Sequence, residues 1–265
     1  AKLLNSRLNF TGEYYVKNTK DILLAVPVPL EYGFGKPNMN IGQVRNKGWE
    51  LSLGWNNRIN DFGYSVSANL SDNRNEVVDL GDTGPWKSST TYTEVGLPFN
   101  SIYGYESMGL FQSDEEVAEA PFQNSKTGAG DIRYKNQNGD DKIDANDRVV
   151  LGDPNPHFLY GLNLSFDYKN FDLGIFFQGI GQQDRIVKDN FIRPLYDATF
   201  FEHQLDYWSP QNTNAKYPRI LNKDDANHNY ENSDFWMINA GYLRMKNLTL
   251  GYTIPVSYTH LRAHE

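Results

Sequence analysis

The sequence predicts an all-β fold, namely a segment of a large antiparallel transmembrane β-barrel of about six strands, with long extracellular loops that contain short helices. Three observations predict it. Apolar and polar residues alternate over several stretches, which indicates strands because successive side chains of a strand point to opposite faces. Short and long connections alternate between these stretches, as in outer-membrane barrels. Aromatic residues make up 14% of the chain, yet no apolar run approaches the roughly 18 residues of a membrane helix.

Composition excludes several other classes of protein. The net charge of −8 argues against a nucleic-acid partner, because such partners require clustered Lys and Arg. The chain contains no cysteine, so disulfides and thiolate metal sites are excluded. It also has neither a His-Glu-x-x-His nor a Gly-x-Ser-x-Gly motif, and the sequence therefore predicts no enzyme.

The first three predicted strands cover residues 7–17, 49–55 and 64–70. In each of them apolar side chains occupy every second position, as Trp49, Leu51, Leu53 and Trp55 do in the second. Small and polar residues fill the positions between. Each of these stretches is therefore expected to have one apolar and one polar face.

The clearest alternation forms a hairpin over 158–178. Its first arm places these residues on one face: Tyr160, Leu162, Leu164, Phe166 and Tyr168. A tight turn is predicted at Lys169 and Asn170, and the second arm repeats the pattern with only Phe176 out of place. About ten residues per arm is the length that crosses a bilayer as a tilted strand. A soluble β-sandwich, in which the apolar face packs on a second sheet, is also compatible with a single hairpin.

The connections between strands sort by length. Short turns are expected at 57–61 and 169–170, and long intervals at 18–47, 72–157 and 180–239, before a last strand over 247–254. Every long interval therefore leaves from the same end of the sheet. In outer-membrane barrels that end is external and the short turns are periplasmic, whereas soluble sandwiches seldom sort their loops this strictly.

The long intervals have predicted local order of their own. Residues 102–111 are expected to be extended, and Ser113 with Glu116 forms a capping box that starts a short helix through Ala120. The apolar spacing over 195–208 predicts a second helix.

Several stretches together resemble the SusC/RagA family of TonB-dependent outer-membrane transporters. They are 14–21, 40–51, 103–105, 109–112, 130–134, 150–163 and 242–255. The resemblance implies a barrel of about 22 strands with an N-terminal plug. It also implies import of bulky nutrients, glycans or peptides, beneath a SusD-like lipoprotein lid and powered by TonB through the plug. Residues 1–256 are expected to form part of that barrel without the plug domain, as an internal fragment, and 257–265 to be a non-native tail.

The sharpest local motif is an Asx-rich loop whose oxygen-bearing groups follow the spacing of an EF-hand. The candidate ligands are Asn136, Asn138, Asp140, the Lys142 carbonyl, Asp144 and Asp147. Hard oxygen ligands at these intervals can wrap Ca²⁺. The first ligand is Asn rather than Asp, Asp141 stands where the sharp turn favours Gly, and Asp147 is shorter than the usual Glu. A weak structural Ca²⁺ site and a plain Asx-rich turn are both compatible with this motif.

Polar residues of the strands are predicted to line the transport passage. The candidates for this lumen-facing set are Glu13, Glu50, Asn56, Asn163, Asp167, Asp172, Gln178 and Asn247. Aromatic residues near strand ends are candidates for an interfacial girdle against outer-membrane lipid. These are Trp49, Trp55, Tyr64, Tyr168 and Tyr252. The competing interpretation is a secreted, Ca²⁺-stabilised β-sandwich for binding or adhesion, in which a second layer would cover the apolar faces.

Overall fold

A seven-stranded antiparallel sheet dominates the computed structural model, which describes residues 2–26, 28, 31, 33, 35, 37–81, 83–195, 200–221 and 227–255. Its strands, in their order across the sheet, are β1 (Lys2–Leu3), β2 (Leu8–Ala25), β3 (Asn38–Ile59), β4 (Phe62–Asp79), β11 (His157–Tyr168), β12 (Phe171–Gln182) and β15 (Tyr242–Tyr252). The predicted all-β class and the six principal strands are therefore confirmed. The predicted tail, 257–265, lies outside the described residues.

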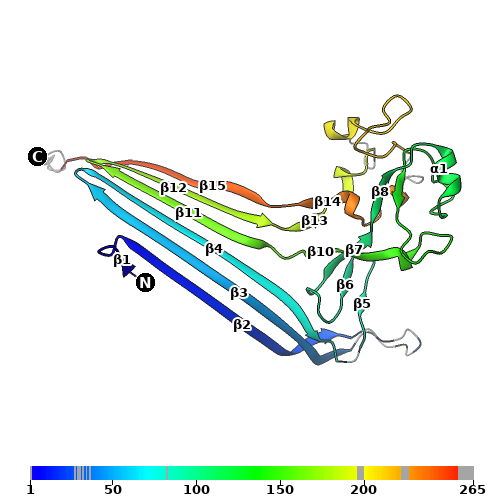
Figure 1. Ribbon diagram of the computed structural model, residues 1–265, viewed down its shortest axis with the longest axis horizontal. Helices are drawn as coiled ribbons and strands as arrows, with labels where there is room; N and C mark the ends of the chain where they lie inside the picture. The colour runs from blue at the N-terminus through cyan, green and yellow to red at the C-terminus, as the bar shows by residue number, and fades with distance from the viewer. Residues whose placement is uncertain are drawn as a thin grey trace, which may run out of the picture.

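Spatial order in the large sheet follows chain order, so neighbouring strands are joined by hairpins or by long excursions (Figure 1). The two tight turns lie at one end of the sheet. Asn60 and Lys169 occupy the left-handed region there, with φ of 53° and 54°. The excursions between β4 and β11 and between β12 and β15 lie at the other end, which confirms the predicted sorting of loops by length.

β2 and β3 extend much further than the alternation predicted. The loop expected over 18–47 was wrong, because β2 runs to Ala25 and β3 begins at Asn38. In this region polar residues face each other across the two strands, as Asn18 does with Arg45. Apolar residues return further along, but the register shifts between Thr19 and Ile22 and again between Ile22 and Leu23, so no regular alternation of hydrophobicity marks this part of the two strands in the sequence.

A β-bulge in β15 explains an irregular apolar pattern. Phe176 of β12 pairs with Asn247, whereas Phe177 pairs with Met245, so Lys246 is the extra residue. The bulge places Met245 and Leu248 on the same face although their spacing is odd. Phe176, which breaks the pattern of its own strand, lies on the opposite face with Asn163 and Asn247.

Smaller elements form an assembly at the loop end of the sheet, which we call the loop assembly (the described residues within 80–156 and 183–241). Its strands are β5 (Trp86–Lys87), β6 (Thr91–Thr93), β7 (Ser101–Tyr105), β8 (Ser107–Leu110), β9 (Ile132–Tyr134), β10 (Arg148–Gly152), β13 (Asp184–Ile186) and β14 (Met237–Asn239). Its helices are α1 (Asp114–Glu119) and the 3₁₀ turns η2 (Ala145–Asp147), η3 (Asp189–Phe191), η4 (Glu202–Leu205), η5 (Asn227–Tyr230) and η6 (Asp234–Trp236).

The two helix predictions had different outcomes. Ser113 caps α1 as expected, since its side chain accepts a hydrogen bond from Glu116 N. The helix predicted over 195–208 was wrong in its described part, where the chain forms only the short turn η4; residues 196–199 lie outside the described residues. No helix in the described part of the chain is long and apolar enough to cross a membrane.

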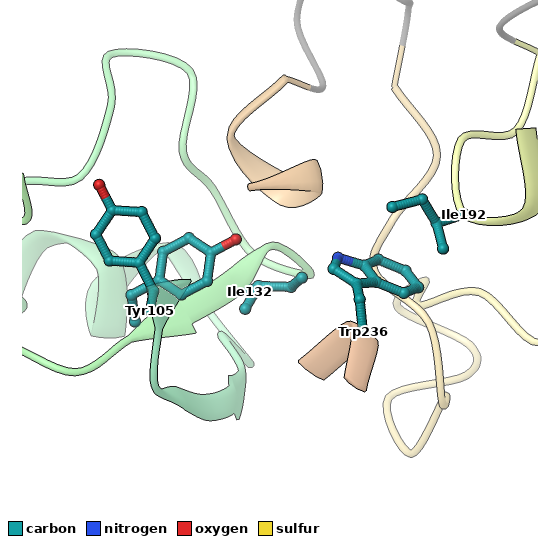
Figure 2. Close-up of a cluster of buried hydrophobic side chains, with 5 residues drawn as sticks. Tyr105, Ile132, Ile192 and Trp236 are labelled. Carbon is teal, nitrogen blue, oxygen red and sulfur yellow. The ribbon is translucent and has the colours of Figure 1, made fainter. Parts of the chain in front are cut away.

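The hydrophobic core of the described chain lies in the loop assembly. Its buried members are Tyr105, Ile132, Tyr134, Ile192 and Trp236 (Figure 2). Tyr105 and Tyr134 pack with ring centroids 4.9 Å apart, and Trp236 packs against Tyr217 and Phe235. Within the large sheet, by contrast, Val77 at the loop end of β4 is the one described strand residue with a buried apolar side chain. The sheet therefore has no core of its own.

Candidate functional site: the two faces of the sheet and the loop assembly

One face of the large sheet is apolar. Cross-strand pairing aligns its residues in rows, with one residue from each of the six long strands. One central row consists of Leu8, Trp55, Val66, Leu164, Ile175 and Leu248. The adjacent row consists of Phe10, Leu53, Ala68, Leu162, Phe177 and Met245.

This apolar face is uncovered in the described part of the chain. Leu53 is 46% exposed, Leu248 58% and Leu250 74%. No second layer lies against the long strands between the tight turns and the loop assembly (Figure 1). Exposed apolar area of this extent is rare on soluble monomers and indicates a surface that is covered by lipid or by another protein.

Aromatic residues border the apolar face at both ends. At the loop end Tyr14 pairs with Trp49, and at the turn end Phe62, Tyr168, Phe171 and Tyr252 are aligned. The rings of Phe171 and Tyr252 are 4.7 Å apart. Trp49, Tyr168 and Tyr252 thus lie where a girdle was predicted.

Two of the girdle candidates do not lie at a border. Trp55 is in a central row, and Tyr64 is one row inside the turn end, because β3 continues to Ile59 beyond the strand end that the pattern indicated.

The eight predicted lumen-facing residues all lie on the opposite, polar face. Glu13 pairs directly with Glu50, and Asp167 pairs directly with Asp172. Asn56 faces Ser65, Asn163 faces Ser67 and Phe176, Gln178 faces Gly161 and Arg244, and Asn247 faces Phe176. That this face lines a passage stays a prediction.

A charged cluster lies on the polar face near the tight turns. Arg58 forms an ion pair with Asp167, whose cross-strand neighbour is Asp172. Arg58 and Asp167 border an open depression of about 470 Å³ that Arg7 and Asn56 also line. Like charges directly opposite each other on a sheet are unfavourable, so Arg58 stabilises the Asp167–Asp172 pair by partly neutralising it.

A buried aspartate organises the loop assembly. Asp131 is fully buried, and its two oxygens accept hydrogen bonds from Arg219 (Nε and Nη2, both 2.8 Å), His228 Nε2 (2.8 Å), Asn229 Nδ2 (2.8 Å) and Gly128 N (2.9 Å). Asn229 Oδ1 in turn accepts from Ile132 N. We call the set Asp131, Arg219, His228 and Asn229 the Asp131 cluster. It joins Asp131 to residues that lie 88 to 98 positions later in the sequence.

The hydrogen bonds of the cluster lower the pKa of Asp131 by more than its burial raises it. Burial alone would raise the pKa of Asp131, but the bonds from His228, Arg219 and Asn229 lower it from 3.8 to about 2. The carboxylate is therefore charged throughout the neutral range. A buried charge is tolerated here because each oxygen has several donors.

The turn before Asp131 requires glycine. Gly130 has φ of 88°, a region that L side chains rarely adopt. Its N–H donates to Phe111 O at 2.7 Å, and a Cβ at this position would collide with the Trp208 ring.

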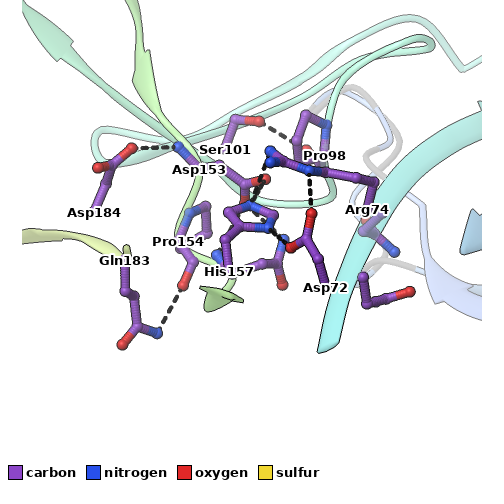
Figure 3. A network of polar contacts seen from close by, with 12 residues as sticks. Asp72, Arg74, Pro98, Ser101, Asp153, Pro154, His157, Gln183 and Asp184 are labelled. Carbon is purple, nitrogen blue, oxygen red and sulfur yellow. Dashed lines mark hydrogen bonds and ion pairs between the residues drawn. The ribbon is translucent and has the colours of Figure 1, made fainter. Parts of the chain in front are cut away.

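A second polar network connects the sheet to the loop assembly. His157, at the start of β11, is 2% exposed, and its Nδ1 lies 2.7 Å from Asp72 Oδ1 of β4 (Figure 3). Its Nε2 lies 3.1 Å from Asp153 Oδ2, and Asp153 N donates to Asp184 Oδ2 at 3.0 Å. These contacts hold the end of the long connection between β4 and β11 against β4.

The Asx-rich loop uses its oxygens to accept hydrogen bonds from its own chain. Asp147 is fully buried, and its oxygens accept from Gln137 N and Asp144 N, both at 2.8 Å. Asp140 Oδ1 accepts from Lys142 N at 3.0 Å, and Asp144 Oδ2 pairs with Lys142 Nζ at 2.7 Å. In this arrangement the loop has the geometry of the Asx-rich turn, and Ca²⁺ binding stays a prediction.

Replacing Asp147 with Asn is expected to destabilise this loop by about 1–3 kcal/mol, because an amide group would turn an N–H toward one of the two backbone donors. Hydrogen exchange of residues 136–147 in the full-length protein measures the effect. Asp141→Asn, at an exposed position of the same loop, is the control and should leave exchange unchanged.

The same measurement tests the predicted metal site. If the loop binds calcium, added Ca²⁺ slows the exchange of 136–147 and Asp144→Asn abolishes that slowing. Unchanged exchange at saturating Ca²⁺ would contradict the prediction.

No protein-family model matches the chain. Its sequence is 31% identical over 269 residues to TonB-dependent receptor P26 of Formosa agariphila, covering 97% of this chain and 27% of that protein. It is 26% identical to TonB-dependent receptor SusC of Bacteroides thetaiotaomicron, covering 94% and 24%. Its fold matches a structure of the RagAB peptide transporter with a TM-score of 0.75 at 25% identity, covering 98% of this chain and 28% of that one. The chain belongs to the SusC/RagA family of TonB-dependent receptors.

This SusC/RagA-type chain spans about a quarter of the length of the relatives it matches. The relatives are named as receptors and transporters, not as enzymes. The resemblance predicted from the spaced motifs is confirmed over nearly the whole chain.

Sequence reasoning missed the residues that hold the loop assembly of this SusC/RagA-type segment together. Asp131 is 88 positions from Arg219 and 97 from His228, so no local spacing connects them. His157 was missed as well, because its partner Asp72 lies 85 positions away. The one available signal was Gly130-Asp131, which lies inside a stretch that carried the family resemblance.

Proposed function

We propose that this chain forms part of the wall of an outer-membrane importer of bulky nutrients. In this proposal the apolar face contacts lipid, the polar face lines the passage beside the plug, and the loop assembly meets substrate outside the cell. A SusD-like lipoprotein covers the entrance, and TonB supplies energy through the plug.

The height of the apolar face carries this proposal. Ile59 lies ten positions after Trp49 in β3, and these residues belong to the two border rows. At about 3.4 Å per residue the distance along the strand is about 34 Å. With the tilt of about 40° usual in outer-membrane barrels, this becomes about 26 Å, which matches an apolar band of about 25 Å.

The exposure of the same face argues against the β-sandwich. A sandwich requires a second sheet about 10 Å away across the apolar side chains. The described chain places its remaining elements at the loop end instead, where they have their own core. A secreted adhesion module would expose this apolar face to water, which predicts aggregation.

The comparisons favour peptides over glycans as cargo. The matching structures are described as a peptide transporter and a peptide importer. Across the paired strands the polar face carries carboxylates, amides and hydroxyls, with Tyr15 and Phe176 as its aromatic rings near the passage, which suits peptide backbones better than sugar rings that stack on aromatics.

Single-cysteine labelling of the full-length protein in cells tests the two faces. The chain contains no cysteine, so each introduced thiol in this region is unique to it. Asn163→Cys and Leu164→Cys are adjacent in β11 but lie on opposite faces. We expect a water-soluble maleimide to label Cys at 163 through the passage, and a lipid-soluble maleimide alone to label Cys at 164.

Positions at the two ends of the sheet test orientation. Glu115→Cys, in α1, should react with a membrane-impermeant maleimide added to whole cells. Lys169→Cys, in a tight turn, should react only after the outer membrane is permeabilised. Equal labelling of 163 and 164 by both reagents would contradict the lipid-facing assignment.

A further inference from the structure

A cluster of cations lies just beyond the aromatic border of the apolar face. The row next to Tyr14–Trp49 on the loop side contains Val16, Lys47 and Arg74. The following row contains Asn18, Arg45 and Glu76. All of these residues share a face with Leu51 and Leu53, because each row is two positions from the last.

The depth of this cluster corresponds to the headgroup layer. One row is about 6.8 Å along the strand, or about 5 Å of depth at the tilt used above. Lipid headgroups occupy roughly the 5–8 Å outside the hydrocarbon core on each side. If the apolar face meets lipid, Lys47 and Arg74 therefore lie at the level of lipid phosphates in the leaflet on the loop side.

Two cations are directly opposite each other in this cluster. Lys47 and Arg74 are cross-strand partners on adjacent strands. Like charges in this position repel, and an anion between them removes the repulsion.

The carboxylates nearby neutralise the cluster only in part. Glu76 reaches both Arg45 and Lys47, but at 3.7 Å in each case. Asp72 binds Arg74 at 2.9 Å, yet it is only 6% exposed and also faces His157. The side chains of Lys47 and Arg74 are 47% and 57% exposed. The accessible surface thus presents three cations and one carboxylate.

We propose that Lys47, Arg74 and Arg45 form a binding site for the phosphate groups of a membrane glycolipid headgroup. This inference rests on the proposed function, since it requires the apolar face to be embedded in lipid. The Arg guanidinium groups bind phosphate in a bidentate manner, and Lys47 adds a point charge. Bound lipid would fasten this side of the barrel at the level where the loop assembly begins.

The test uses the full-length protein, delipidated and reconstituted in nanodiscs of phosphatidylcholine with a minor fraction of lipid A, which carries two phosphates. Native mass spectrometry then counts the lipid A retained per protein. The double variant Lys47→Gln/Arg74→Gln is expected to retain roughly 30-fold less, because each of the two cations near an anionic lipid surface contributes about 1 kcal/mol. Retention by the unaltered protein should also fall as salt is raised.

Two control variants separate this site from general effects of charge and folding. Arg185→Gln/Lys216→Gln removes the same charge from exposed positions of the loop assembly and should retain lipid A as the unaltered protein does. The conservative exchange Lys47→Arg/Arg74→Lys should also retain it.

The outcomes distinguish the two proposals. Equal retention by Lys47→Gln/Arg74→Gln and the unaltered protein, with both inserted in the discs, would overturn the phosphate site and leave the importer intact. Failure of the unaltered protein to insert at all would overturn both.

Discussion

Replacing Leu53 with Arg is expected to destabilise insertion of the full-length barrel by about 2–4 kcal/mol, the cost of a cation near the middle of the lipid-facing side of a barrel. Leu53 lies in a central row between Phe10 and Ala68, and its side chain is 46% exposed. Refolding into phospholipid vesicles across a urea titration, followed by the heat-dependent gel mobility of the folded barrel, measures the change.

Ser52→Arg is the matched control for this prediction. Ser52 precedes Leu53 but lies on the polar face between Thr11 and Asn69. An arginine there can remain in a hydrated passage, so its cost should be clearly smaller than that of Leu53→Arg. Equal costs at the two positions would show that lipid does not cover the apolar face.

Replacing Asp131 with Ala is expected to open the loop assembly, with a local loss of about 3–5 kcal/mol, because Arg219 would be left without its buried carboxylate. His228 and Asn229 would lose the same acceptor. Hydrogen exchange of 128–134 and 227–236 in the full-length protein reports the loss. Asp141→Ala, at an exposed position, should leave the same amides protected, and an equally mild effect of Asp131→Ala would refute the organising role of Asp131.

Acid should release the same cluster in a defined range. The pKa of Asp131 is about 2 in the folded protein and 3.8 ordinarily. Because the folded value is the lower one, the carboxylate contributes its full stabilisation above about pH 4 and loses it as pH falls toward 2. The difference corresponds to about 2 kcal/mol. The protection factors of amides 128–134, which are corrected for the pH dependence of intrinsic exchange, should therefore fall between pH 4 and 2 in the unaltered protein, and this fall should be absent in Asp131→Asn.

The strands that cross the apolar band could be predicted from sequence, but their ends could not. Leu162 and Leu164 belong to a run with an apolar residue at every second position, which indicates the face on which they lie. This period of two residues is a local property of the chain. On the loop side of Trp49 the first facing residues of β2 and β3 are mostly polar, as Asn18 and Arg45 are, and further along the register of the two strands shifts between Thr19 and Leu23. The alternation of apolar and polar residues is then lost, although the backbone pairing of β2 with β3 continues.

In the candidate site, too, the residues on the strands could be predicted from sequence and the fold of the long loops could not. The polar face was predicted residue by residue, and the structure places Glu13, Asn163 and Asp167 together on it. The predicted helix over 195–208 failed because apolar spacing in this interval reflects packing against distant segments. Trp208, for example, lies against Gly130 and donates its indole N–H to Gln112 Oε1 at 3.2 Å.

The sequence by itself determined which residues of the hairpins face each way, because an extended chain alternates its side chains whatever surrounds it. Only the tertiary structure decided how the long excursions fold. Asp131 meets Arg219 and His228, and His157 meets Asp72, through contacts between segments that are distant along the chain and follow no period. The reason is physical: a buried charge must find several donors at once, and those donors come from whichever segments the folded loops bring to it.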